Sequence, residues 1–271
     1  MNGTLIDQLH NAEIKPFPTA ALKIVEMVKD PSTRPSDITQ QISFEPSIAV
    51  RVLRVANSPL YGFSRKIGSI DQAVVVLGNN AVRDLVVTAA AADLFEGDSE
   101  TAAGREGLWL HSLGCATVAA LLAADTTDVP VNEAFLAGML HDVGKLIFYD
   151  VVPSEYTQIE TVANADSIIA MESDRFGITH QEIGERCIEE WGLPDVLCDA
   201  VSFHHAPDDA LCAPKLVEIV ARANYLAREW QLGGDADSTE HDSDAAASDA
   251  DAELKMRAMS EFEQLRKACK S

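Results

Sequence analysis

Apolar residues recur at helical spacing along almost the whole chain, and this pattern limits the possible fold more than any other feature of the sequence. Near the N-terminus, the apolar positions follow the i, i+3/i+4, i+7/i+8 rule of a helix with one buried face. Prolines and glycines interrupt the pattern at short intervals, and this spacing is typical of short helices joined by tight connections. The sequence therefore predicts an all-α fold, built as a compact solenoid or bundle. The residues behind this prediction are Ala20, Ala21, Ile24, Val25, Val28, Ile48, Val52, Val55 and Ala56, with breakers at Pro16, Pro18, Pro31, Pro35, Pro46, Pro59, Gly68 and Gly78.

Local signals place several helix ends. Ser69, with Asp71 in the next turn, is suited to a helix N-terminus, and Thr179-x-x-Glu182 forms a capping box that opens a helix running to Trp191. The β-branched run 74–76 could be a strand, but its apolar flanks favour helix. We interpret Asn57 structurally, as a side chain that caps the end of a helix.

The middle of the chain contains two strongly apolar segments, Arg105–Asp125 and Glu133–Tyr149. Apolar residues surround each predicted helix on nearly every side. Because such a helix is buried within a bundle rather than laid on its surface, we expect both segments in the interior.

Residues 233–252 contain no large apolar side chain, and residues 235–253 hold eight acids with no Lys or Arg. Such a segment cannot offset its ordering entropy by burial, so we predict an acidic disordered linker over 233–252. A C-terminal helix is expected over 253–271. The sequence leaves open whether this helix docks onto the body of the protein or binds a partner.

The formal net charge is -22, although residues 1–95 are neutral, with nine Lys/Arg against nine Asp/Glu. An acidic surface repels nucleic acid and anionic lipid, so we expect neither direct nucleic-acid binding nor membrane association. No apolar run approaches the roughly 18 residues of a membrane span, and the first residues are too polar for a signal peptide. Cytoplasmic localisation is therefore expected. The five cysteines lack C-x-x-C spacing, which argues against a zinc ribbon or a disulfide framework.

The residues best suited to chemistry are His141 and Asp142, with Lys145 one turn later, inside the segment GMLHDVGKLIFY. A carboxylate within an apolar helix is costly unless it is paired or bound to a cation. Imidazole and carboxylate together suit a divalent metal. Further histidines that could contribute are His111, His180, His204 and His205.

Each of these residues also has a purely structural explanation. Asp142 and Lys145 could form an i, i+3 ion pair, and His111 could be a hydrogen-bonded core histidine. His180 could serve only as a helix-start residue, and His204-His205 could be a surface turn. Chance explains less well why six residues that could bind a metal, the five histidines and Asp142, fall within one block of 95 residues. The set as a whole therefore favours a metal site.

The order of His111, then His141-Asp142, then later histidines resembles the HD superfamily of metal-dependent phosphohydrolases. Further motifs are similar to its HDOD branch: GMLHDVG at 138–144, HQEIG at 180–184, WGLP at 191–194 and HHAP at 204–207. The N-terminal segments ISFEPSIAVRVLRVANSPLYGF and KIGSIDQAVVVLGNNAVRDLV match this branch as well. The resemblance covers about residues 10–230. One small departure is Glu45, where the family usually has Asp before Pro46.

The resemblance implies a two-lobed, multi-helix HDOD fold, with an N-terminal helical lobe over 1–100 and an HD-like helical bundle over 101–232. It also implies a metal site at His111, His141, Asp142, His180, His204, His205 and Asn224. Active HD enzymes carry Asp at the position of Asn224, whose neutral amide oxygen is a weaker ligand. The GYP segment of cyclic-dinucleotide phosphodiesterases is absent after His205.

Two functions remain open. The first is a bacterial signal-transduction regulatory module, non-catalytic, with signalling protein partners and a nucleotide as a candidate ligand. The second is a phosphohydrolase or phosphodiesterase acting on a nucleotide or cyclic nucleotide, with Lys145 as its catalytic residue and Fe, Mn, Mg, Zn or Ni as the metal. A scaffold that uses the acidic linker and the C-terminal helix is compatible with the first.

Overall fold

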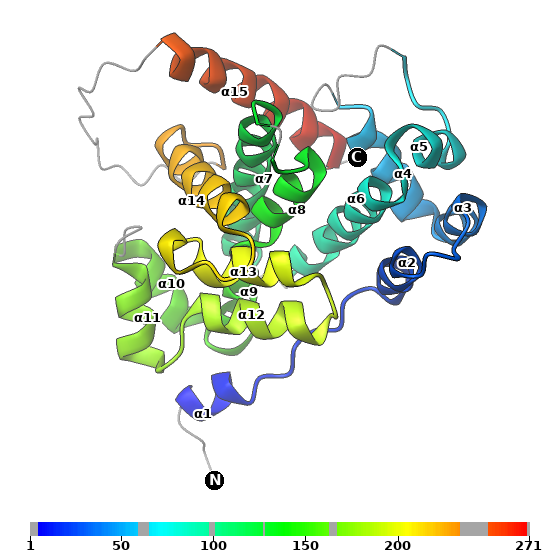
Figure 1. Cartoon of the computed structure of the whole chain (residues 1–271). Coiled ribbons are helices and arrows are strands. Elements are labelled where there is room, and N and C mark those ends of the chain that lie inside the picture. Colours follow the sequence, from blue (N-terminus) through cyan, green and yellow to red (C-terminus); the bar gives the residue numbers. More distant parts are fainter. Residues whose placement is uncertain are drawn as a thin grey trace.

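A computed structural model describes residues 5–58, 65–97, 101–126, 128–162, 167–233 and 249–269, and within these ranges the regular secondary structure is entirely helical (Figure 1). This confirms the predicted all-α class. The helices before residue 100 are α1 (Leu5–His10), α2 (Thr19–Lys29), α3 (Pro35–Ser43), α4 (Pro46–Ala56), α5 (Ile70–Leu77), α6 (Asn79–Ala91) and the 3-10 turn η2 (Ala92–Phe95). Those that follow are α7 (Ala102–Ala124), α8 (Val131–Leu140), α9 (Lys145–Val151), α10 (Pro153–Val162), α11 (Ile168–Phe176), α12 (His180–Glu190), α13 (Asp195–Phe203), η3 (Pro207–Asp209), α14 (Pro214–Glu229) and α15 (Asp249–Cys269).

The predicted helix starts and ends have the expected hydrogen bonds. The Ser69 side chain accepts from the Gln72 backbone N–H at the start of α5, so the β-branched run 74–76 is helical. The Asn57 side chain caps the end of α4 by donating to the Leu53 carbonyl at 2.6 Å. It also exchanges two hydrogen bonds with the backbone of Ile67, at 2.7 and 2.9 Å. Asn57 thus ties α4 to the segment that leads into α5.

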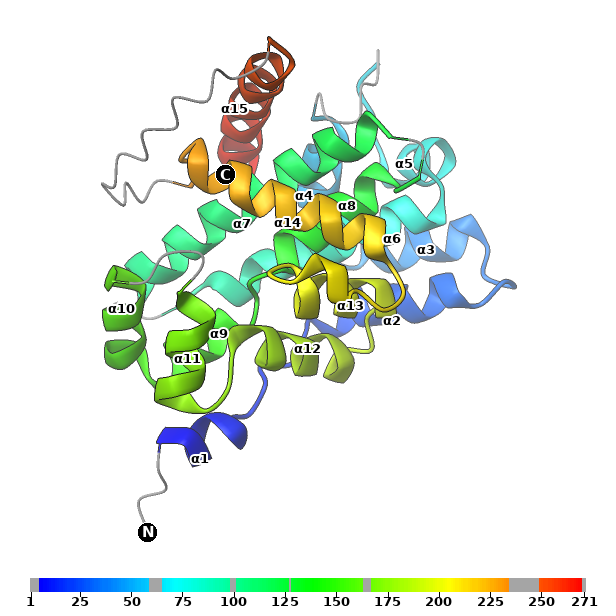
Figure 2. The ribbon, with the colours of Figure 1, turned by 60° about the vertical axis from the view of Figure 1, so that its left-hand side comes forward.

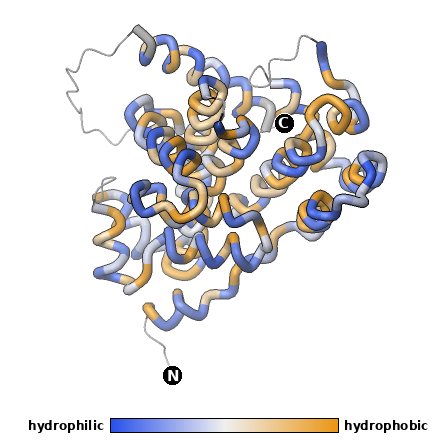
Figure 3. The backbone as a smooth tube through the Cα atoms, viewed as in Figure 1, coloured by the Kyte–Doolittle hydropathy of each residue, from blue (hydrophilic) through white to orange (hydrophobic). Residues whose placement is uncertain are grey.

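Helix α7 is the centre of the molecule. It packs against α8 and α14, and α6 contacts α8 to join the N-terminal helices to the rest (Figure 2). Hydrophilic and hydrophobic residues alternate along most outer helices, whereas the residues of α7 are largely hydrophobic (Figure 3). By length and composition, α7 is the one helix of the described residues that could cross a membrane, and 67% of its most apolar window is buried in the protein. Its apolar character therefore fits a core helix.

The expectation of one continuous helix over Glu133–Tyr149 was wrong. The structure breaks this segment into α8 and α9, separated by tight turns at 141–144. Backbone hydrogen bonds from Val143 to Leu140 and from Lys145 to Asp142 span three residues rather than four. The reason lies at Gly144, where a Cβ atom would come within 2.0 Å of the His180 carbonyl oxygen. Helix α12 approaches this turn so closely that only glycine fits.

The predicted acidic linker over 233–252 lies mostly outside the described residues, which resume at Asp249 with α15. That helix docks onto α7 and α4.

We predict that Asn57→Ala lowers the free energy of unfolding by about 1–3 kcal/mol, because it leaves the Ile67 N–H without its partner and uncaps α4. Urea denaturation followed by circular dichroism measures this change. The matched control is Asn11→Ala, because Asn11 is exposed and makes one local hydrogen bond to the Asp7 carbonyl. Equal effects of the two substitutions would contradict the assigned role of Asn57.

Candidate metal centre

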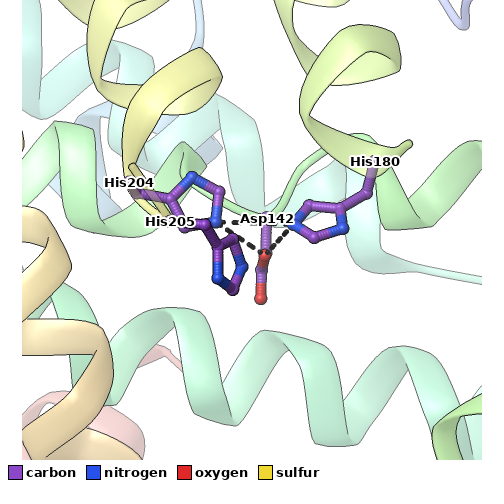
Figure 4. A group of neighbouring side chains, drawn as sticks. All are labelled: Asp142, His180, His204 and His205. Atoms are coloured by element: carbon purple, nitrogen blue, oxygen red, sulfur yellow. Dashed lines mark hydrogen bonds and ion pairs between the residues drawn. The ribbon is translucent and has the colours of Figure 1, made fainter. Parts of the chain in front are cut away.

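The side chains proposed from the sequence converge from different elements of the fold. Asp142 lies at the centre, and His180, His204 and His205 surround it in Figure 4. The elements that supply the proposed residues are α7 for His111, the turn after α8 for His141 and Asp142, the first residue of α9 for Lys145, the first residue of α12 for His180, the end of α13 for His204 and His205, and α14 for Asn224.

The carboxylate of Asp142 is completely buried, and each of its two oxygens faces a different group of nitrogen atoms. Oδ2 lies 2.7 Å from the Lys145 ammonium and 3.2 Å from His141 Nε2. His111 Nε2 lies 3.7 Å from the same oxygen. Oδ1 lies 3.2 Å from His180 Nε2 and 3.5 Å from His204 Nε2. Asp142 is therefore shared by two potential half-sites.

The Nδ1 atoms of the central histidines are already engaged. Those of His141 and His204 lie 2.8 and 2.9 Å from the carbonyl oxygen three residues earlier, and that of His180 lies 2.8 Å from the Glu172 carboxylate. A ring nitrogen that faces a carbonyl or carboxylate oxygen must carry the proton. In a neutral imidazole, Nε2 then presents a lone pair, and in all three rings Nε2 points at Asp142. Lone pairs that converge on a carboxylate require a proton or a metal ion between them.

The proton distribution expected without metal follows from the same geometry. Burial alone would lower the pKa of His141, but the Asp142 carboxylate outweighs it and raises the pKa to about 10. Burial would likewise lower the pKa of His180, and the Glu172 carboxylate outweighs it and raises the pKa. Burial would raise the pKa of Asp142, whereas the charges of His141 and Lys145 hold it well below its ordinary range. In the absence of metal, the Asp142 carboxylate therefore favours a proton on His141, and the Glu172 carboxylate favours a proton on His180.

The other three histidines of the cluster, His111, His204 and His205, have lowered pKa values, which favour the neutral imidazole. Burial lowers the pKa of His204 to about 4, and the partial stabilisation from Asp142 does not restore it. Burial also lowers the pKa values of His205 and His111, with added repulsion from neighbouring cationic groups. One buried carboxylate can stabilise the charged form of only some of the imidazoles around it, so their pKa values shift in opposite directions.

The donor set fits a divalent metal best beside Asp142 Oδ1. Together with His180 Nε2 and His204 Nε2, this oxygen forms a triangle with edges of 3.2, 3.4 and 3.5 Å. Ligands about 2.0–2.2 Å from one ion lie at such separations from each other. His205 belongs to the same group of potential ligand atoms, all within 4.8 Å of one another. Asp142 Oδ1 and His205 Nε2 are buried without a hydrogen-bond partner among the described residues.

The half-site beside Asp142 Oδ2 is less suited to a metal ion. His111 Nε2 lies 3.0 Å from Asn224 Oδ1, so these two side chains form a hydrogen bond with each other. Asn224 supplies no negative charge. The carboxylate oxygen on this side, Asp142 Oδ2, is already bonded to the Lys145 ammonium. The ion pair between Asp142 and Lys145, which the sequence offered as a structural explanation, is therefore present within the same cluster.

Glu172 of α11 is the residue that sequence reasoning missed. Its buried carboxylate accepts hydrogen bonds from the His180 backbone N–H at 2.8 Å, from His180 Nδ1 and from the Tyr156 hydroxyl at 2.8 Å. A signal did exist, since Glu172 lies four residues from both Ile168 and Phe176 on the buried face of its helix. A carboxylate behind a metal-binding histidine fixes its tautomer and increases its basicity.

We predict that Glu172→Gln weakens metal binding by about 10–100-fold, because His180 loses the negative charge that orients and polarises it. Isothermal titration with Zn²⁺ or Mn²⁺ measures the affinity. Glu190→Gln, on the exposed end of α12, is the matched control and should leave the affinity unchanged. An unchanged affinity in Glu172→Gln would show that His180 is not a ligand.

We also predict that metal binding weakens as the pH falls, because an ion must displace the proton from His180, whose pKa is raised in the metal-free protein. Between pH 8 and pH 6 each displaced proton lowers the affinity by up to about tenfold per pH unit. Titrations in buffers of different ionisation enthalpy count the protons released. Binding that releases no proton and is independent of pH would contradict this arrangement.

Comparison with known proteins identifies the family and the fold of this chain. The HDOD domain family model matches residues 14–207. A crystal structure of an HDOD domain protein of unknown function from Geobacter sulfurreducens is 26% identical, with a TM-score of 0.72, and the match covers 97% of this chain and 92% of that one. The same fold occurs in a protein from Shewanella amazonensis named as a candidate metal-dependent phosphohydrolase, at 15% identity and a TM-score of 0.71, covering 98% and 96% of the two chains.

Among curated proteins, an uncharacterised protein of Treponema pallidum is 25% identical over 224 residues. That match covers 80% of this chain, which spans only 42% of the length of the relative. The family model covers well over half of the chain, and the matched crystal structure has the same helical fold. The chain therefore belongs to the HDOD domain family.

Proposed function

We propose that this protein is a regulatory module of bacterial signal transduction that acts in the cytoplasm through protein or ligand binding and does not hydrolyse phosphoesters. The observation that carries the proposal is the charge of the site. Among the proposed metal ligands, Asp142 is the only carboxylate, and the Lys145 ammonium lies 2.7 Å from it. The net charge of these two groups is zero, so a pair of divalent cations would share a single carboxylate whose charge the adjacent ammonium already offsets.

A single ion is compatible with this charge. We assign it to Asp142, His180, His204 and His205, because Asp142 Oδ1 is free of the Lys145 ammonium and Glu172 supports His180 from behind. When bound, a divalent metal would supply a Lewis acid and an acidified water. The protein's own contribution would be to hold the imidazoles in one tautomer and to shield the ion from solvent.

Access to the site also favours regulation. His141, Asp142 and His180 are 0% exposed, and His204 is 3% exposed. The most open ligand on the opposite side is His111, with a side chain 17% exposed. A phosphoester that reaches Asp142 would have to displace protein side chains. Binding of a ligand or a protein partner at the surface of the protein requires no such displacement.

A second candidate, a metal-dependent phosphohydrolase acting on a nucleotide or cyclic nucleotide, is favoured by one observation. Lys145 is nearly buried and adjacent to the potential ion sites, where its ammonium could stabilise negative charge that develops on a phosphoryl group. In this function Lys145 would be the catalytic residue, and His111 and Asn224 would complete a second ion site. The neutral amide of Asn224 is the feature that weakens this candidate.

We predict that the wild-type protein, supplied with Mn²⁺ or Fe²⁺, shows no turnover of bis(p-nitrophenyl) phosphate or of cyclic nucleotides above the level of Asp142→Ala. The Asn224→Asp variant should bind additional metal beside His111, because it restores a carboxylate next to Nε2. Asn11→Asp is the control for an added surface charge. Wild-type turnover that is lost in Asp142→Ala and in Lys145→Ala would overturn the regulatory proposal.

A further inference from the structure

The C-terminal end of α14 lies against α7 where the histidine cluster is partly open to solvent (Figure 1). A Cβ atom at Gly233 would come within 2.7 Å of the His111 backbone nitrogen. One at Gly114 would come within 2.6 Å of the Leu232 carbonyl oxygen. The His111 side chain is 17% exposed, so the last turns of α14 border an accessible edge of the cluster.

The hydrogen bond between His111 and Asn224 determines which atoms remain available at this edge. His111 Nε2 lies 3.0 Å from Asn224 Oδ1. Because an amide oxygen can only accept a hydrogen bond, Nε2 carries the proton and offers no lone pair to a metal ion. The remaining polar group of the buried Asn224 side chain is Nδ2, which can only donate.

Arg228 adds a positive charge one turn further along α14. It follows Asn224 by four residues, so the two side chains are neighbours on one face of the helix. Burial is the main cause of the lowered pKa of His111, and repulsion from the Arg228 guanidinium is the next. Arg228 is therefore close enough to the His111 imidazole to act on it.

The Arg228 guanidinium is only partly exposed and has no carboxylate partner among the residues that the structure describes. Other arginines of low exposure are paired, as in Arg51–Asp93, Arg83–Asp84 and Arg105–Asp150. The chain has 43 acidic residues against 21 Lys and Arg, so a shortage of carboxylates does not explain the missing partner. A partly buried charge without a partner favours an anion from outside the chain.

The one carboxylate near this edge is already neutralised. Asp142 Oδ2, which lies 3.7 Å from His111 Nε2, accepts a hydrogen bond from the Lys145 ammonium at 2.7 Å. The groups left beside His111 are therefore N–H donors, one of them cationic. Such a set repels a metal ion and attracts an anion.

We propose that Asn224 and Arg228 form an oxyanion site at this edge, where their N–H groups bind two oxygen atoms of one carboxylate or phosphate group. Charge-assisted N–H···O bonds from a guanidinium match the paired oxygens of such groups. The bound anion contacts the cluster through Asn224, which is bonded to His111. The inference rests on the proposed function in one respect, because it requires that no metal ion occupies the Oδ2 side.

The test titrates the full chain, freed of metal by dialysis, with inorganic phosphate and in parallel with acetate, at constant pH and ionic strength. The NMR signals of the His111 imidazole report binding. We expect a saturable shift with at least one anion, and the tighter of the two identifies the group. Arg228→Gln should weaken binding at least about tenfold, because it removes the charge-assisted bonds. Arg222→Gln, an exposed arginine of the same helix, is the matched control and should change the affinity less than about twofold.

Asn224→Asp is the second variant. It exchanges an N–H donor for a negative charge and should weaken anion binding at least about tenfold. The proposal is overturned if neither anion gives a saturable shift, if both arginine variants lose the same affinity, or if Asn224→Asp binds the anion as well as the wild type does. Failure of the regulatory proposal appears differently, as phosphodiester turnover or a second metal ion in the wild-type protein, and the metal-free titration measures neither.

Discussion

The buried carboxylate of Asp142 is the constraint on which the arrangement of α7 to α14 depends. A charge with no exposure to solvent must be compensated locally, and here five nitrogen atoms from different elements lie within 4 Å of it. To place them there, α8 must end at Leu140, α12 must approach the turn closely enough to exclude any side chain at Gly144, and α13 must end at the paired histidines. The motif spacing in the sequence reflects these requirements.

The sequence predicted much of this arrangement because its signals are local. Helix period, the caps at Ser69 and Thr179 and the side-chain bonds of Asn57 depend on residues a few positions apart. The break between α8 and α9 could not be predicted in the same way, since the contact that requires it joins Gly144 to His180, which is distant in the chain. Glu172 was missed for a similar reason, because its role depends on the packing of α11 against the start of α12.

The charge of the site is the basis on which we propose binding rather than catalysis. A ligand set with one carboxylate and an adjacent ammonium can hold an ion, but it provides little negative charge to bind a second ion or to support hydroxide. The fold of this chain brings the histidines together, and Asn224 adds a neutral amide rather than a carboxylate to that assembly. Function in such a protein is determined by its site rather than by its fold.

The most direct measurement is a crystal structure of the protein soaked in Mn²⁺, with anomalous scattering used to locate and count the ions. We predict one ion, bound by Asp142, His180, His204 and His205. Two ions of similar occupancy bridged by Asp142, with one of them bound by His111 and Asn224, would contradict it.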